Sequence, residues 1–153
     1  MKLALMVAAL TVTCVAIPAA YAATDAECEE MWKKADANND GVLSDAEAQR
    51  YSAAMRVAER QLPANGKWDR AAFLDACKGD LFAPRKADAG APLKGANSFT
   101  EGQAKDRAMA HGFGSVGDLK KDDDGIWRGS AIQDGKQVQI AVDYKGNVVT
   151  ASQ

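Results

Sequence analysis

Oxygen-bearing residues recur at a fixed spacing between positions 36 and 47, where together they can surround one metal ion. Counted from Asp36, the donors fall at positions 1, 3, 5, 7, 9 and 12 of a twelve-residue loop. They are the side chains of Asp36, Asn38 and Asp40, the main-chain carbonyl of Val42, and the side chains of Ser44 and Glu47. Gly41 stands at the sharpest turn, which needs a permissive backbone. We expect Glu47 to close the coordination shell with both carboxylate oxygens.

Calcium is the cation that these donors favour. Ca²⁺ takes six to eight oxygen ligands in a flexible cage, whereas Mg²⁺ keeps more of its water and binds such a cage less well. An Asn- and Asp-rich turn between two helices is the alternative interpretation, but it does not explain why all six donor positions are filled. Three carboxylates face a charge of +2, and we expect a dissociation constant from about micromolar to submillimolar.

Helices are expected on both sides of this loop, within an all-α domain over residues 23–79. Thr24-Asp25-Ala26-Glu27 is a capping box that begins one helix, and Ser44-Asp45-Ala46-Glu47 repeats it for a second helix ending near Pro63. A third helix is closed by Gly79. The three apolar faces consist of Cys28, Met31, Trp32 and Ala35, then Ala48, Tyr51, Met55 and Ala58, then Ala71, Phe73, Leu74 and Cys77.

A second, degenerate loop surrounds Gly66. Trp68 is expected opposite Leu43 of the first loop, but Ala72 stands at the closing position and cannot bind a cation. We therefore expect a structural role for this loop. Gly41 and Gly66 are 25 residues apart, which is shorter than in ordinary loop pairs and argues against close pairing.

The first 22 residues have the composition of a signal peptide. Lys2 precedes an uncharged run, and Ala20-Tyr21-Ala22 places small residues where a signal peptidase cleaves. The alternative is an uncleaved membrane anchor, but Pro18 interrupts a run barely long enough to cross a bilayer of roughly 30 Å. Cleavage near Ala22 would leave a periplasmic or secreted protein.

The number of cysteines and the net charge restrict the properties expected of the mature chain. Cys14 leaves with the predicted signal peptide, so Cys28 and Cys77 form an even pair in an oxidising compartment. We expect one disulfide between them, with two buried thiols as the alternative. Without Lys2 the chain has 18 basic and 21 acidic residues, a formal charge of −3 that indicates neither nucleic acid nor a membrane surface as a partner.

Residues 80–97 are rich in Ala, Gly, Pro and Lys and are expected to form a linker with one apolar anchor, Leu81-Phe82. Residues 98–153 then predict a helix and an antiparallel β-meander. The helix begins at Ser98-Phe99-Thr100-Glu101 and ends at His111-Gly112. The expected strands are 116–121, 126–133, 137–144 and 148–150, separated by turns at Asp124-Gly125, Asp134-Gly135 and Lys145-Gly146. The fold class is α+β.

No set of residues in this second half predicts catalysis. His111, the only histidine, stands at a helix end without a nucleophile beside it, which favours a capping or surface role. Asp122-Asp123-Asp124-Gly125 imitates part of a calcium loop but lacks a closing glutamate, and a hairpin turn is favoured. Trp127 is expected to pack in the interior, with an aromatic contact to a bound peptide as the alternative.

The mature chain resembles bacterial exported proteins that join an EF-hand segment to a PepSY-like domain. The twelve residues of the first loop resemble the EF-hand. Five other stretches resemble PepSY: Ser98-Phe99-Thr100-Glu101-Gly102-Gln103-Ala104, Gly114-Ser115-Val116, Asp124-Gly125-Ile126-Trp127, Asp134-Gly135-Lys136, and Val142-Asp143-Tyr144-Lys145-Gly146-Asn147-Val148. PepSY domains resemble a helix packed on a small antiparallel sheet, and their association with protease propeptides implies a role as a modulator of peptidases.

Two functions are therefore expected for this chain. In the first, the calcium-loaded domain steadies a non-catalytic module that binds an exported protein, a peptide or a peptidase. In the alternative, the protein is a simple calcium buffer or sensor, and residues 98–153 are a spacer. A hydrolase is disfavoured because no base and nucleophile form a pair.

Overall fold

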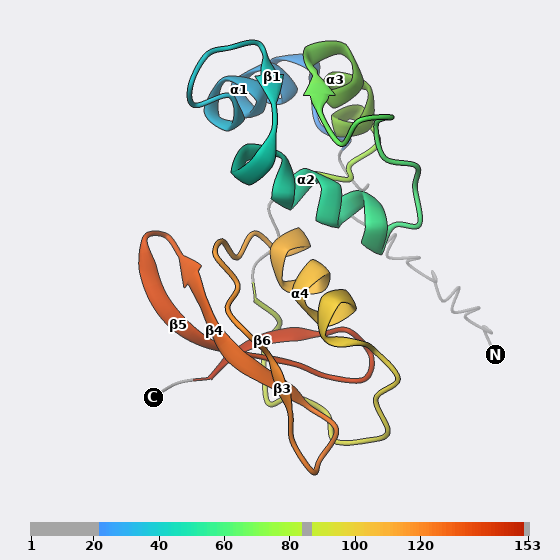
Figure 1. The fold of residues 1–153 in the computed structure, drawn as a ribbon, viewed down its shortest axis with the longest axis vertical. Helices are drawn as coiled ribbons and strands as arrows, with labels where there is room; N and C mark the ends of the chain where they lie inside the picture. Colours follow the sequence, from blue (N-terminus) through green and yellow to red (C-terminus); the bar gives the residue numbers. More distant parts are fainter. Residues whose placement is uncertain (1–21, 84–86, 152–153) are drawn as a thin grey trace, which may run out of the picture.

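The chain folds into a helical half and a half that joins one helix to an antiparallel sheet (Figure 1). The computed structural model describes residues 22–83 and 87–151. The predicted signal peptide, apart from Ala22, lies outside these residues. Within the described ranges, no helix is both long and apolar enough to span a membrane. The predicted α+β class is confirmed for this part of the chain.

The helical half contains three helices and two short strands. They are α1 (Asp25–Ala35), β1 (Val42–Leu43), α2 (Asp45–Val57), β2 (Trp68–Asp69) and α3 (Arg70–Lys78). The capping box at Thr24 is confirmed, because its hydroxyl accepts the Glu27 amide while the Glu27 carboxylate accepts the Thr24 amide. The prediction that the second helix ends near Pro63 is wrong: α2 ends at Val57, and Glu59 has a positive φ of 53° that helical geometry forbids.

An aromatic core holds the three helices together. The Tyr51 ring packs edge-on against Phe73 and Phe82, with ring centroids 4.8 and 4.9 Å apart. Trp32 and Trp68 complete the group, against Phe73 and Phe82 respectively. Phe82 is buried, which confirms the apolar anchor expected beyond the last helix.

The expected disulfide is present and joins the first helix to the third. Cys28 of α1 and Cys77 of α3 are bonded, with their Cα atoms 5.9 Å apart and a sequence separation of 49. Both side chains are fully buried in the aromatic core. The bond therefore ties the helix before the 36–47 loop to the end of the helical half.

The two loops pair closely, although their spacing argued against it. β1 and β2 form an antiparallel ladder in which Leu43 lies opposite Trp68 and Val42 opposite Asp69. The predicted register of Leu43 and Trp68 is thus confirmed, while the expectation that the loops stand apart is wrong. Each loop contributes only two residues to the ladder, so a short connection is long enough to reach it.

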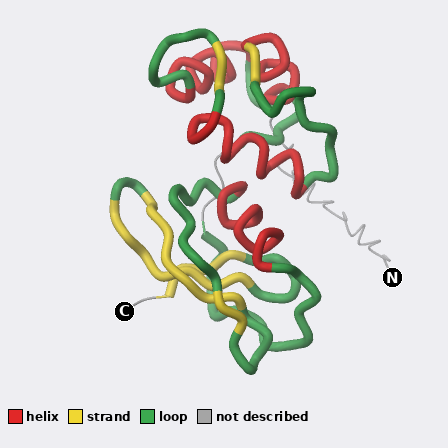
Figure 2. The backbone as a smooth tube through the Cα atoms, in the orientation of Figure 1, coloured by secondary structure: helices red, strands yellow, loops and turns green. Residues whose placement is uncertain are grey.

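The second half is a four-stranded antiparallel sheet with one helix on it. Its elements are α4 (Glu101–Ala110), β3 (Lys120–Lys121), β4 (Trp127–Gln133), β5 (Lys136–Val142) and β6 (Val148–Ala151), and the strands pair in sequence order. Ala104 and Ala108 of α4 pack with Ile140 and Val142 of β5. Small alanines let the helix approach the sheet closely, and Figure 2 shows the helix beside the sheet, on the side of the helical half.

Several boundaries in this half differ from those predicted, including that of the strand expected over 137–144, which ends at Val142. The cap of α4 is Thr100, whose capping box is completed by Gln103, so the helix begins two residues later than a cap at Ser98 implies. The strand expected over 116–121 is reduced to Lys120–Lys121. Ser115 has a positive φ of 43°, which breaks the extended backbone there.

Residues 87–97 contain neither helix nor strand, yet they are bound to the sheet. The Asp88 amide donates to the Val148 carbonyl and its carboxylate accepts the Val148 amide, both at 2.7 Å. The Gly95 amide donates to the Asp124 carbonyl at 3.0 Å. Residues 87–97 of the expected linker are therefore packed along the second half.

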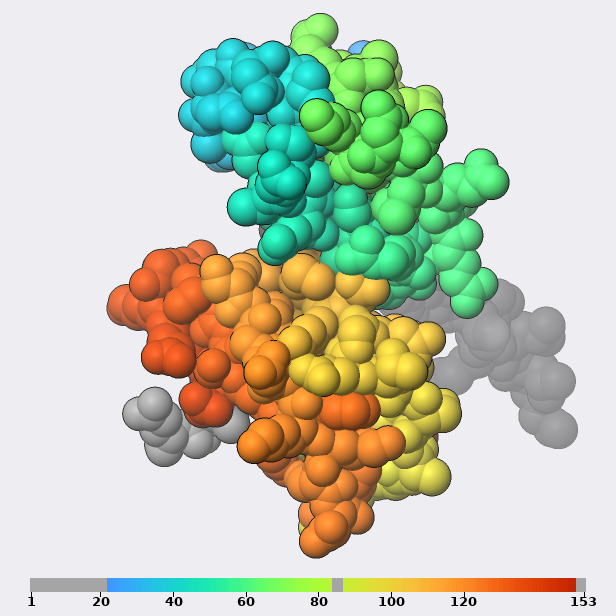
Figure 3. Space-filling model, in the orientation of Figure 1, coloured from blue at the N-terminus to red at the C-terminus, as the bar shows by residue number. Residues whose placement is uncertain are grey.

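The two halves meet through α2 and α4, a contact that the sequence left open. Figure 1 shows α4 lying between α2 and the sheet, and Figure 3 shows the two lobes in contact. The Arg56 guanidinium of α2 donates two hydrogen bonds, of 2.7 and 2.5 Å, to the Asp106 carboxylate of α4. Ala110 of α4 is buried in the same cluster as Tyr51 and Phe82.

Candidate metal centre

The loop between α1 and α2 is folded by its own side chains. Asp36 ends α1 and is almost completely buried; its carboxylate accepts the amides of Asp40 and Gly41, each at 3.1 Å. The Asn38 side-chain oxygen also accepts the Asp40 amide, and the Asp40 carboxylate accepts the Val42 amide, both at 2.9 Å. Acceptor oxygens near the start of the loop thus bend the following backbone around themselves.

The tight curvature also requires a left-handed backbone at two positions. Gly41 has φ of 82° and Asn39 has φ of 57°. Glycine adopts this region without steric cost, and asparagine is among the few other residues that tolerate it. The sequence Asn39-Asp40-Gly41 therefore suits the observed turn.

Glu47 reaches back from the first turn of α2 to the start of the loop. Its carboxylate accepts the amides of Ala37 at 3.0 Å and Asn38 at 3.3 Å. Ser44 is the N-cap of α2, but its side chain makes no capping hydrogen bond. The capping box predicted at Ser44 and Glu47 is therefore wrong. The two amides across the loop take the place of the Ser44 amide as donors to Glu47.

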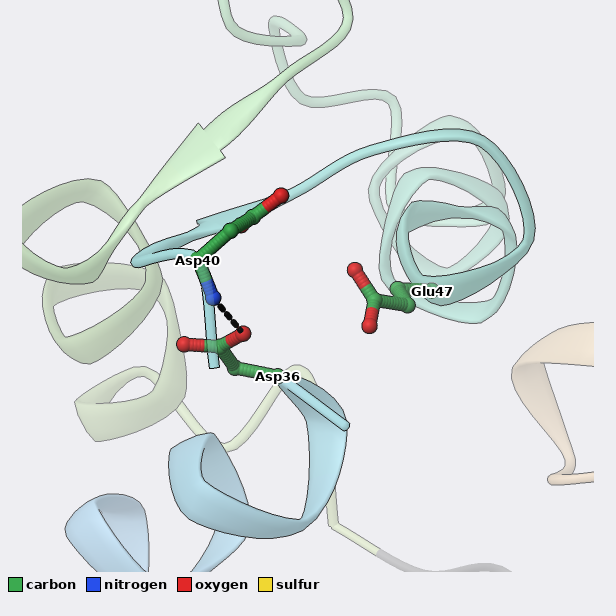
Figure 4. A group of neighbouring side chains, drawn as sticks. All are labelled: Asp36, Asp40 and Glu47. Atoms are coloured by element: carbon green, nitrogen blue, oxygen red, sulfur yellow. Dashed lines mark hydrogen bonds between the residues drawn. The ribbon is translucent and has the colours of Figure 1, made fainter. Parts of the chain in front are cut away.

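The hydrogen bonds within the loop and those of Glu47 bring three carboxylates close together. One oxygen from each of Asp36, Asp40 and Glu47 lies within 4.8 Å of the other two. Figure 4 shows the Glu47 carboxylate projecting from α2 toward the two aspartates. Oxygens on opposite sides of a calcium ion lie about 5 Å apart, since each Ca–O bond is about 2.3–2.6 Å. The observed separations fit within a single calcium shell.

The charge of this cluster is not balanced by basic side chains. Among the residues that the structure describes, none of the three carboxylates forms an ion pair with Lys, Arg or His. Backbone amides supply only partial positive charge, and like charges held this close repel one another. A divalent cation would relieve that repulsion, so the donor set suits a hard metal ion.

The remaining predicted ligands lie in the same loop. Asn38 donates its side-chain amide to Asp40 at 3.0 Å, which leaves its oxygen turned toward the loop backbone. Val42 is in β1, where it pairs with Asp69, and Ser44 follows directly. The structure thus brings the carboxylates of Asp36, Asp40 and Glu47 together, and the other three predicted ligands lie between them along the same loop.

The second loop has a structural arrangement. The Asp69 carboxylate accepts the Ala72 amide at 2.8 Å and so caps α3. Trp68 is buried, and its indole N–H donates to the Ser52 hydroxyl at 3.1 Å. The Asp69 carboxylate, which could have offered a ligand oxygen, therefore caps a helix instead.

Asp122 and Trp127, for which the sequence offered alternative roles, form a turn and pack against the core, respectively. Asp122 accepts the amides of Asp124 and Ile126 and pairs with Arg128, which confirms a hairpin turn between β3 and β4. Trp127 packs with the α4-facing core, and its indole N–H donates to the Phe99 carbonyl at 3.1 Å. The packing role predicted for Trp127 is confirmed.

The only histidine ends a helix, as its place in the sequence favoured. His111 is the C-cap of α4, and its ring nitrogen Nδ1 lies 3.9 Å from an Asp88 carboxylate oxygen. The capping role is confirmed. The Asp88 carboxylate also accepts the Val148 amide, so this histidine lies where residues 87–97 meet the sheet.

One buried carboxylate was missed by the sequence reasoning. Asp143 is fully buried and accepts the amides of Leu93, Lys145 and Asn147 together with the Asn147 side chain. Burial opposes its charge, but these donors outweigh burial and hold the pKa of Asp143 below its usual range. The Asp–X–X–Gly–Asn pattern of the turn at 143–147 was the available signal.

Comparisons with known proteins add no family to this description. No protein-family model matches the chain, and no curated protein or solved structure is significantly similar to it.

Proposed function

We propose that this protein is an exported calcium-binding protein in which the 36–47 loop binds one Ca²⁺. The observation that carries the proposal is the convergence of Asp36, Asp40 and Glu47, from both ends of the loop, within the span of one coordination shell. Glu47 closes the shell, and Asn38, Val42 and Ser44 supply the other oxygens. The proposed role is an EF-hand, in agreement with the β1–β2 ladder that joins this loop to its degenerate partner.

Export is the second part of the proposal. The Cys28–Cys77 disulfide supports it, because such bonds persist in oxidising compartments. The calcium concentration outside the cytoplasm also suits the dissociation constant expected for this loop. That value is micromolar to submillimolar, roughly the weaker half of the range for comparable loops.

Isothermal titration of residues 23–153 with CaCl₂ tests the calcium site. We expect one equivalent of calcium, with Mg²⁺ binding more weakly because its smaller shell demands closer oxygens. Glu47→Gln should abolish the heat of binding. Asp45→Asn is the matched control: it removes the same charge at an exposed position two residues away, where asparagine tolerates the positive φ of 43°.

The outcome of that comparison separates coordination from general attraction. Loss of binding in Glu47→Gln with binding retained in Asp45→Asn supports direct coordination. Equal losses in both variants would show that net charge alone attracts the cation, and silence of the wild-type chain at millimolar calcium would end the proposal.

For residues 98–153 we infer a non-catalytic module that contacts another exported protein, a peptide or a peptidase. Val138, Ile140 and Val142 face α4, so the alternating residues Gln137 and Gln139 are on the opposite face, where both are exposed. Ala141 on the same face is buried with Ile126 and Val149, so the exposed part available to a partner is the end of β5 that carries the two glutamines. The packing of α4 on α2 supports this function over a simple spacer.

A pull-down from a periplasmic fraction with residues 23–153 as bait tests the second part. Capture of a partner that is lost when Gln137 and Gln139 are both replaced by Lys supports the module. Capture that survives the replacement would show that Gln137 and Gln139 do not form the contact, and no capture beside a normal calcium titration favours the buffer or sensor.

A further inference from the structure

Helix α2 contributes both to the candidate calcium site and to the contact between the two halves. Its first turn belongs to the site, and the rest of its length forms the contact. Glu47 is in its first turn and is bonded to the loop amides. Arg56 is in its last turn and is bonded to α4. A rigid helix of thirteen residues therefore joins the two places.

The burial of α2 shows that it is covered on opposite sides. Tyr51 faces the aromatic core, where its ring meets Phe73 and Phe82. Ala53 is also completely buried, yet it lies about 200° away around the helix axis, since successive residues are about 100° apart. A helix on the surface of a domain would leave one of these two sides exposed. α2 is an interior helix of the whole protein.

The contacts with α4 run along the length of α2 in antiparallel order. The Arg50 guanidinium lies beside Gly112, just after α4, and it also donates to the Phe82 carbonyl at 3.3 Å. Further along, Arg56 binds Asp106 within α4. Fixing the position of α2 thus fixes α4, and with it the sheet that α4 covers.

We propose that calcium binding at the 36–47 loop is coupled through α2 to the docking of the C-terminal half. This inference rests on the proposed calcium site. Without a cation, mutual repulsion of Asp36, Asp40 and Glu47 opposes the position of α2 in which Glu47 faces the loop. Calcium favours that position, and α2 held there presents Arg50 and Arg56 to the second half. Because coupling between sites is reciprocal, docking must tighten calcium binding by the same factor by which calcium tightens docking, so weakening the α2–α4 contact weakens calcium binding by up to that factor.

Hydrogen exchange and calorimetry on residues 23–153 test the coupling. We expect calcium to slow amide exchange in α4 and β5, which contain no proposed ligand. Asp106→Asn removes the charge that Arg56 grips and should weaken calcium binding about fivefold, at the low end of typical coupling because the pair is half exposed. Asp118→Asn is the matched control, because its ion pair with Lys105 lies within the second half.

A second variant distinguishes loss of the ion pair from a local folding defect at residue 106. Arg56→Gln breaks the same ion pair from the α2 side and should give the same loss of affinity as Asp106→Asn. The double variant should lose no more than either single one, because each already removes the interaction.

The outcomes distinguish this inference from the proposed function. Calcium binding with unchanged affinity in Asp106→Asn and Arg56→Gln, and with unchanged exchange in α4, would overturn the coupling and leave the calcium site standing. No calcium binding by the wild-type chain would overturn both.

Discussion

Breaking the Cys28–Cys77 disulfide is expected to lower the free energy of unfolding by about 4 kcal/mol. The bond closes a loop of 49 residues. In the chain-entropy estimate, the restriction that a loop of this length places on the unfolded chain amounts to about 4 kcal/mol at 25 °C. For a cooperative unit of 60–100 residues, each kcal/mol corresponds to about 4–8 °C in the unfolding midpoint, so the shift should exceed about 15 °C.

Two samples separate loop closure from packing. Reduced wild-type protein loses the bond but keeps both sulfur atoms in the core, whereas the double variant Cys28→Ala, Cys77→Ala also leaves a small cavity. Each removed sulfur is expected to lower stability by a further amount on the order of 1 kcal/mol. The double variant should therefore be the less stable of the two.

Urea unfolding in excess calcium, followed by the fluorescence of Trp32 and Trp68, measures both effects. These indoles are in the aromatic core that the disulfide joins. A reduced wild-type protein within about 1 kcal/mol of the oxidised one would refute the loop-closure reasoning. Such a result would mean that the unfolded chain is already compact between the two cysteines.

Further predictions concern the second half. Gly125→Ala should destabilise it far more than Gly135→Ala: both glycines have positive φ, but a Cβ at 125 would lie 2.0 Å from the Gly95 carbonyl oxygen, whereas one at 135 meets nothing within 4 Å. Equal urea midpoints would contradict the packing of residues 87–97 on the hairpin. Asp143→Asn should lower stability at pH 7 by about 1–3 kcal/mol, because a buried, charged acceptor of four hydrogen bonds is lost. Since its pKa is lower in the folded state, Asp143 stabilises the fold above the unfolded value of about 3.9, and this contribution is lost as pH falls through the folded pKa. Urea titrations from pH 7 to 3 should show a shallower acid loss in the variant, and identical slopes would contradict this role.

The 36–47 loop shows how far a local pattern can determine the arrangement of side chains. The spacing of Asp36, Asp40 and Glu47 was enough to predict that they converge, because Asp36 and Asp40 are connected by a short loop with few available conformations. Two predictions were made for Glu47: its position at the closing end of the loop agrees with the structure, whereas its capping box with Ser44 is wrong. A glutamate three residues after a serine fits a capping box equally well, and only the placement of the Ala37 and Asn38 amides across the loop decides between the two bonds.

Features that depend on neighbours within a few residues could be predicted from the sequence. These include the capping box at Thr24, the buried face of α1 with Cys28 and Trp32, the helix end at Gly79 and the hairpin turn at Asp124-Gly125. Each follows from hydrogen-bond donors, backbone freedom or side-chain periodicity inside one short window, so tertiary packing had little to change.

Which surfaces meet could not be predicted from local sequence. Ala53 of α2 looks the same in sequence whether it faces water or another helix, because alanine is compatible with both surroundings. The Arg56–Asp106 pair joins residues 50 positions apart, and no local pattern distinguishes that arginine from its exposed neighbours. The contact between the halves therefore depends on the complementary shapes of complete helices, which exist only after each half has folded.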